Sequence, residues 1–241
     1  MMPSAGPSDL ELLQMEIEIW ANDDRQRRGG PDLVIASSSV GNSARAGTAV
    51  PDDLAATLVN VVSSSPPVSD LSSPPPMLEH CRQLLEARLG PIELRQASGP
   101  SYLITETIGF RSEATLVRSD ASDVAVLRSA NPGNWGAQEW DQLLDGLLGP
   151  WVMATHHGEV ISICHTPASS ARGAEAGTWT RPDFRGQGHA AATTAAWALL
   201  MRPSGRYLFY STSRTNVSSQ RVAARLHLRP IGWLWQLARL R

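Results

Sequence analysis

The chain has 241 residues, of which 42% are hydrophobic, so it can bury one large core or two small ones. Its formal net charge is −2, and we expect neither a nucleic-acid nor a membrane partner, because neither fits so weak a charge. Cys81 and Cys164 are far apart and no Cys/His cluster has zinc spacing. These features argue against a disulfide framework and a metal site, and they favour a reducing, cytoplasmic location. The acidic N-terminus is not expected to be a signal peptide.

The N-terminal part, residues 1–110, is expected to form a small α+β unit. Its helices are marked by capping signals, and its connector is marked by serine and proline. The expected elements are a helix opening at a capping box of Ser8 and Glu11, a strand at 33–36, a loop or hairpin at 37–48, a helix from Pro51 with Leu54, Leu58 and Val61 on one side, a Ser/Pro-rich connector at 63–76, a helix at 77–89, and strands at 92–96 and 102–107.

Residues 111–241 are expected to form a second unit in which strands and helices alternate. The expected elements are a strand at 113–118, a helix at 137–148, a hairpin of strands at 151–155 and 160–165, a strand ending at Arg181–Pro182, a helix at 191–200, a strand at 206–213, a helix at 216–226, and a last strand at 230–237.

A glycine-bearing loop joins the strand that ends at Arg181–Pro182 to the Ala-rich helix. The first N–H groups of a helix have no internal partner, and the helix dipole is positive at that end. Gly186 and Gly188 leave room for a ligand to approach the backbone and permit left-handed dihedral angles. This arrangement predicts an anion-binding site at the start of the helix.

The loop Arg185-Gly-Gln-Gly-His-Ala190 matches the pattern Arg/Gln-x-x-Gly-x-Gly/Ala, with Pro182 and the acidic Glu175 upstream. In this combination the segment resembles the GNAT superfamily of acyl-CoA-dependent N-acyltransferases. It does not match the dinucleotide pattern Gly-x-Gly-x-x-Gly, and no Lys follows the glycines as in a P-loop. The resemblance implies an α+β fold with a mixed, largely antiparallel central sheet and flanking helices over 111–241. This region is one strand short, so either the N-terminal unit or a second subunit in a homodimer would supply the missing edge.

The resemblance also implies acetyl-CoA, or another short acyl-CoA, as co-substrate and a small-molecule or peptide amine as acceptor. The pantetheine arm would pair with the strand before the loop, the pyrophosphate would rest on the loop N–H groups, and Asn216 would bond the arm. Asn216 is equally well explained as a helix N-cap. The residues implied in cofactor binding are Thr178, Trp179, Thr180, Arg185, Gly186, Gln187, Gly188, His189, Ala190, Asn216, Ser219 and Arg221.

Glu175 is the candidate general base. An alkyl amine has a pKa of about 10, so a carboxylate within reach must take its proton before it can attack. Glu175 stands at the strand position where several members of the family carry their catalytic Glu. The alternative is a strand-end Glu that forms a salt bridge with an arginine.

The sequence departs from the family in the helix at 216–226. The Tyr that many members use to protonate the leaving thiolate is replaced by Ala223, and the usual Gly-Phe by His227-Leu228. Tyr210, His165, water or no acid at all remain as alternatives. Two other functions also stay open: a non-catalytic acyl-CoA-binding regulatory module, and O-acyl transfer or other thioester chemistry on the same fold.

Overall fold

The computed structural model describes residues 6–22, 30–90, 92–110, 113–121 and 124–240. Residue 111, where the sequence analysis begins the second unit, and most of the polar segment after the first helix lie outside these ranges. Helices and 3-10 turns are α1 (Asp9–Asn22), α2 (Asp52–Ser63), α3 (Pro76–Leu89), η2 (Ala125–Leu127), α4 (Ala137–Leu144), η3 (Pro182–Phe184), α5 (His189–Met201), η4 (Arg202–Ser204) and α6 (Val217–Arg225). Strands are β1 (Leu33–Ser38), β2 (Gly41–Ala46), β3 (Leu94–Leu103), β4 (Thr115–Arg118), β5 (Trp151–His156), β6 (Glu159–His165), β7 (Gly173–Glu175), β8 (Gly177–Thr180), β9 (Tyr207–Ser211) and β10 (Arg229–Arg239).

The strands form two sheets, which confirms the α+β assignment. The larger sheet has the order β2-β1-β10-β3-β9-β7, and the smaller one has the order β4-β5-β6-β8. Their pairings are antiparallel except for β7 with β9. β7 and β8 are separated in the chain only by Ala176, yet they belong to different sheets. The two sheets therefore diverge from this residue.

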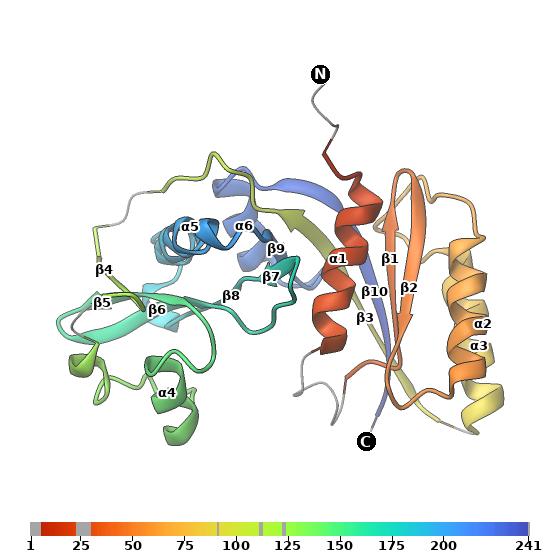
Figure 1. Cartoon of the computed structure of the whole chain (residues 1–241), viewed down its shortest axis with the longest axis horizontal. Helices are drawn as coiled ribbons and strands as arrows, with labels where there is room; N and C mark the ends of the chain where they lie inside the picture. The colour runs from red at the N-terminus through yellow and green to blue at the C-terminus, as the bar shows by residue number, and fades with distance from the viewer. Residues whose placement is uncertain (1–5, 23–29, 91, 111–112, 122–123, 241) are drawn as a thin grey trace.

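Helices cover both faces of the larger sheet. Figure 1 shows α1 on one side of β1 and β10, with α2 and α3 on the other. The capping box predicted for α1 is confirmed, since the Ser8 N–H donates to Glu11 Oε2 (2.8 Å) and the Glu11 N–H donates to Ser8 Oγ (3.3 Å). No described helix combines the length and apolar content needed to cross a membrane.

Helix α5 packs between the two sheets. Its Ala191, Ala195 and Ala198 share one buried cluster with Val152 of the smaller sheet and Leu208 of the larger one. Small side chains let the helix approach both sheets closely, which explains why its sequence is rich in alanine. Helix α4 packs elsewhere: its Trp140 and Leu143 lie in a separate cluster against β5 and β6.

The N-terminal part supplies the strand that the sequence leaves missing. β3 lies between β10 and β9, and it pairs with β10 from Leu94 to Leu103. The prediction of two separate strands, at 92–96 and 102–107, is wrong, because one strand runs through Gly99 and Pro100. The Pro100 carbonyl accepts from the Thr212 N–H (3.2 Å), so the missing N–H of Pro100 faces away from the β10 ladder.

Gly99 is required by a close approach within this part of the sheet. A Cβ atom on Gly99 would lie 1.7 Å from the carbonyl oxygen of Thr212, so any side chain would clash with the backbone after β9. The same glycine that reads as a break in the sequence is thus what lets β3 sit beside that segment.

Two helices differ in detail from expectation. α2 buries Val62 rather than Val61 beside Leu54 and Leu58. α4 ends at Leu144 rather than at residue 148, and Leu147 lies beyond it and is 73% exposed.

The division into units 1–110 and 111–241 remains a proposal, and the shared sheet indicates that the two parts fold together. We expect residues 111–241 alone to show no cooperative thermal unfolding by circular dichroism, because removing β3 leaves β9 and β10 without the strand between them. Deletion of residues 1–5, which precede α1, is the control and should leave the melting temperature unchanged. A fragment 111–241 that melts cooperatively would contradict this expectation.

Candidate active site

The divergence of the sheets leaves one edge of β8 without a strand partner among the described residues. The Trp179 carbonyl accepts from Ser162 Oγ (3.0 Å) and the Arg181 N–H donates to the Ile161 carbonyl (2.9 Å), so both face β6. Because backbone groups alternate along a strand, Thr178 and Thr180 present theirs to the open edge. The Thr180 carbonyl accepts there from Arg185 Nε (3.2 Å). Of the three strand residues singled out in the sequence, Trp179 therefore directs its backbone away from the opening.

The loop after β8 turns into α5 at Gly188, whose φ is +91°. A Cβ atom there would lie 2.8 Å from the Phe110 ring, so both the dihedral angle and the space favour glycine. The Ala192 N–H donates to the Gly188 carbonyl (3.0 Å) and begins the helical pattern. The N–H groups just before it have no acceptor within the helix, and the positive end of the helix dipole lies among them.

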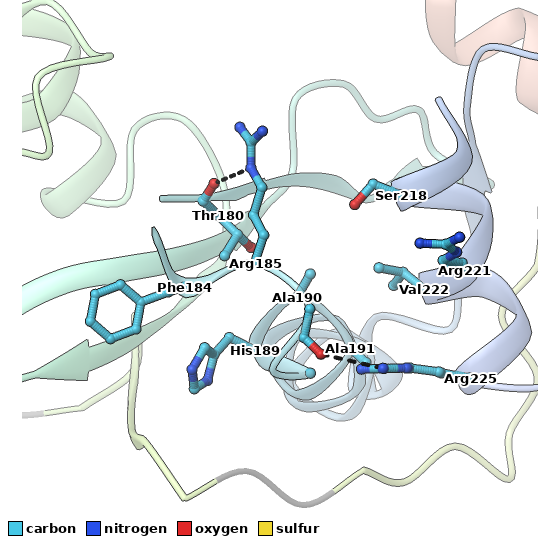
Figure 2. A pocket seen from close by; sticks show the side chains of 12 residues that line it. Thr180, Phe184, Arg185, His189, Ala190, Ala191, Ser218, Arg221, Val222 and Arg225 are labelled. Carbon is cyan, nitrogen blue, oxygen red and sulfur yellow. Dashed lines mark hydrogen bonds between the residues drawn. The ribbon is translucent and has the colours of Figure 1, made fainter. Parts of the chain in front are cut away.

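Arginines surround this helix end. Arg185, Arg221 and Arg225 line a cavity of about 360 Å³ together with Gly186 and Gly188. Figure 2 shows Arg225 reaching from α6 toward the start of α5, and Arg221 beside the same helix. Arg225 also donates to the Gly186 carbonyl (3.3 Å), which ties α6 to the loop. The sequence analysis missed Arg225, although its position four residues after Arg221 puts both on one helix face.

Gln187 and His189 lie at the same loop. Gln187 donates to the Asp183 carbonyl (3.3 Å), and its side-chain oxygen is 3.3 Å from His189 Nε2. In Figure 2, His189 lies beside Phe184, away from Arg225. Burial, and secondarily His156, lowers the pKa of His189, so its imidazole is neutral at neutral pH.

Asn216 caps helix α6, as one of the two readings of the sequence predicts. Its side-chain oxygen accepts from the Ser219 N–H (3.1 Å). Both residues line a second cavity, which adjoins the arginine-lined one. Ser219 Oγ is 2.6 Å from the Tyr210 hydroxyl on β9. The cap therefore also fixes a hydroxyl pair in the cavity wall.

Glu175 is 4% exposed and lies at the end of β7. Its Oε1 accepts from the Ser211 N–H (2.9 Å) and from Ser211 Oγ (2.7 Å), while its buried Oε2 has no partner among the described residues. Burial raises the pKa of Glu175 to about 6, although the two Ser211 bonds lower it. Its recorded partners are thus serine donors, not the arginine that the alternative reading proposed.

Three cavities meet in a row around Glu175. The middle one, of about 630 Å³, is lined by Glu175, Thr178 and Tyr210 among others. It shares Thr180, Arg185, Ala190, Ser218 and Val222 with the arginine-lined cavity. It shares Trp20, Ser211, Thr212 and Ser213 with a third cavity of about 180 Å³. Together they form a cleft that runs from the start of α5, past Glu175, to Trp20 of α1.

The third cavity forms the end of the cleft that lies farthest from the start of α5. Its walls come from α1, β3, β10 and the end of β9, including Trp20, Ser98 and Gln236. Helix α4 is not among the elements that line this cavity, because it packs on the smaller sheet. Trp20 was not among the site residues singled out in the sequence.

The residues considered as general acid lie in different surroundings. Tyr210 lines the middle cavity and is 1% exposed, and burial raises its pKa. His165 instead packs edge-on against Trp135, with ring centroids 5.0 Å apart. Ala223 is buried in the core cluster that includes α5. Among the described residues, no group of three His, Cys, Asp or Glu side chains is arranged to hold a metal ion.

No family model matches the sequence, and no curated protein is significantly similar to it. Solved structures are similar in fold. A GNAT-family acetyltransferase from Colwellia psychrerythraea is 13% identical with a TM-score of 0.51, and the match covers 96% of each chain. A GCN5-related N-acetyltransferase from Kribbella flavida is 16% identical with a TM-score of 0.51, and the match covers 98% of this chain and 97% of that one. Matches over nearly the whole chain include the N-terminal part, which the sequence analysis did not recognise.

The cap on α6 gives a prediction about stability. We expect Asn216→Ala to lower the free energy of unfolding by about 1 kcal/mol, because the Ser219 N–H loses its acceptor. Asn216→Ser, which keeps a side-chain oxygen at the cap, should lose less. Urea denaturation of the three proteins measures the difference, and equal midpoints for Asn216→Ala and the unmodified protein would refute the capping role.

Proposed function

We propose that this chain, which has the GNAT fold, is an acyltransferase that moves an acetyl or other short acyl group from acyl-CoA to an amine. The observation that carries the proposal is the continuous cleft with a buried carboxyl group, Glu175, midway along it. An anion-binding end, an open strand edge and a base are the three parts that such a transfer requires, and they follow one another in this order.

The arginine-lined end of the cleft suits the pyrophosphate of coenzyme A. Free N–H groups at the start of α5 and the positive end of its dipole favour an anion there. Arg185 and Arg221 are exposed and add charge-assisted donors. The open edge of β8 at Thr178 and Thr180 suits the amide groups of the pantetheine arm, which would pair with it like an added strand.

In the proposed reaction, Glu175 Oε2 accepts a proton from the acceptor ammonium, directly or through one water molecule. An N–H bond breaks and an O–H bond forms, and the freed amine lone pair attacks the thioester carbon. The Thr178 N–H on the open edge is our candidate donor to the developing oxyanion. When the C–S bond breaks, the electron pair leaves on sulfur, and the nitrogen loses its second proton, so that a neutral amide forms. A thiol with a pKa of about 8.5 can leave as an anion. Tyr210 is the candidate to protonate it, and the second proton from the nitrogen then restores the phenol.

The pH dependence of the transfer tests Glu175. The base must be ionised, so kcat/KM should rise with pH up to about 6, the pKa of Glu175, and then level until the amine itself titrates. Thiol release from acetyl-CoA against a panel of amines measures this profile. We expect Glu175→Gln to lower turnover by about 10²–10⁴-fold and to leave CoA affinity within a few-fold. Undiminished turnover would remove Glu175 from the mechanism; CoA binding without turnover on any amine would favour the regulatory-module alternative.

The cationic end of the cleft gives a second prediction. We expect Arg221→Ala to weaken CoA binding by about tenfold in calorimetry, because an exposed charge-assisted hydrogen bond to phosphate contributes on the order of 1.5 kcal/mol. The loss should shrink at high salt. Arg202→Ala, an exposed arginine at the opposite end of α5, is the matched control and should bind CoA normally. Equal affinities for both variants would contradict the assignment of this end to the phosphates.

A further inference from the structure

Glu16 is a completely buried carboxyl group on α1, with 0% of the residue exposed. The helix packs it beside an apolar cluster that includes Leu12, Ile19 and Phe209. A carboxyl group is rarely buried this fully unless it is paired, since burial of its charge costs more than burial of an apolar side chain. Its position therefore calls for a specific partner.

Two serines place Glu16 next to Glu175. Ser101 Oγ donates to Glu16 Oε2, and Ser211 donates through its N–H and its Oγ to Glu175 Oε1. Ser101 of β3 and Ser211 of β9 are directly opposite each other in the sheet. Side chains at opposite positions lie on the same face, with Cβ atoms about 5 Å apart. The two carboxyl groups are thus held side by side by neighbouring hydroxyls.

Each carboxyl group keeps one oxygen without a partner. Glu16 Oε1 and Glu175 Oε2 are both buried, and neither has a hydrogen-bond partner among the described residues. The charged groups elsewhere on α1 are already paired, Glu18 with Arg172 (2.7 Å) and Asp9 with Arg229. The Tyr210 phenol on β9 is the other titratable group that acts near Glu175. No cation that would neutralise the pair is recorded among the described residues.

Two adjacent buried carboxyl groups cannot both ionise at modest cost, because each negative charge destabilises the other. Burial, and secondarily Glu175, raises the pKa of Glu16 well above its ordinary range, while the bond from Ser101 opposes the shift. Glu175 receives two bonds from Ser211 and ionises first, with a pKa of about 6. Of the two, Glu16 is therefore the carboxyl group that keeps its proton longer as the pH rises.

We propose that Glu16 and Glu175 form a carboxyl pair that holds one proton at neutral pH, on Glu16, and that Glu16 is the positioning residue for the base. The proposal rests on the proposed function for its catalytic meaning. The Glu16 O–H directs its hydrogen toward Glu175 Oε2, directly or through one water, and steadies the ionised base. When Glu175 takes the proton of the amine, the pair becomes neutral. Release of that proton to solvent along the cavities lined by Trp20 restores it.

Infrared spectroscopy tests the proton directly, without any turnover. At neutral pH the unmodified protein should show the C=O band of a protonated, buried carboxyl group. Glu175→Gln should keep this band and Glu16→Gln should remove it, while Glu18→Gln, an outward-facing residue on the same helix, is the matched control and should keep it. Absence of the band from the unmodified protein, or its persistence in Glu16→Gln, would overturn the proposal even if the protein transfers no acyl group.

The variants also separate positioning from packing. Glu16→Gln is neutral and keeps donor and acceptor atoms. Its kcat/KM, and the acidic limb of the pH profile of kcat/KM, should therefore stay close to those of the unmodified protein. Glu16→Leu removes the donor to the ionised Glu175, so the limb should move to higher pH. Equal displacement of the limb in both variants, or no displacement in Glu16→Leu, would contradict the role.

Stability provides a readout for variants that fold but do not turn over. A carboxyl group whose pKa is raised in the folded state stabilises fully below its unfolded pKa of about 4.3, and this stability is lost as pH rises toward the folded value. The Glu16→Gln variant has no carboxyl group at this position, so it does not lose this stability as the pH rises. Its urea midpoint should therefore rise relative to that of the unmodified protein as the pH increases above the unfolded pKa of about 4.3. Parallel pH dependences for the two proteins would count against a proton on Glu16.

Discussion

The divergence of β7 and β8 at Ala176 is the constraint on which the rest of the structure depends. The Ala176 N–H donates to the Phe209 carbonyl of β9 (2.9 Å), and the following residue, Gly177, pairs with His165 of β6. The chain thus changes partner within two residues. Past that point β8 has no strand partner on the side of the larger sheet among the described residues, and the backbone of Thr178 and Thr180 faces this open edge as a consequence. Helix α5 fills the space behind the divergence, and its alanines let it do so. The cleft and the start of α5 are therefore two results of a single change of partner.

The N-terminal part contributes to the site as well as to the fold. β3 enters the larger sheet between β9 and β10, and this insertion places Ser101 opposite Ser211. Helix α1 crosses the same sheet and brings Glu16 and Trp20 to the far end of the cleft. Residues 111–241 contain the loop before α5 and Glu175, whereas part of the wall beyond Glu175 and the second carboxyl group come from the N-terminal part.

Local signals in the sequence predicted local structure. The capping box of α1, the loop at Gly188 and the N-cap at Asn216 each depend on contacts within a few residues, and each was readable. The long strand β3 was not, because Gly99 and Pro100 look like a break until the backbone of Thr212 is known to lie against them. The role of Glu16 could not be predicted either. It lies within an amphipathic helix, and its hydrogen-bond partner is a serine 85 residues away in the sequence. Pairing across such distances leaves no periodic trace in one sequence.

Charge divides the cleft into two unlike ends. Three arginines and the start of a helix make one end cationic, whereas the described lining of the other end consists of uncharged residues, among them Trp20, several Ser and Thr residues, Leu234 and Gln236. Under the proposed function, a ligand with a polyanionic tail would be held in one orientation, with the tail at α5 and the uncharged head near Glu175. The same asymmetry acts on the second substrate. An anionic acceptor would meet the carboxylate of Glu175 in a poorly solvated place, where like charges repel strongly, whereas an ammonium group would be attracted to it. The electrostatic field that would seat the carrier thus also selects for a basic acceptor, and the protonation of Glu16 keeps that selection at a single negative charge.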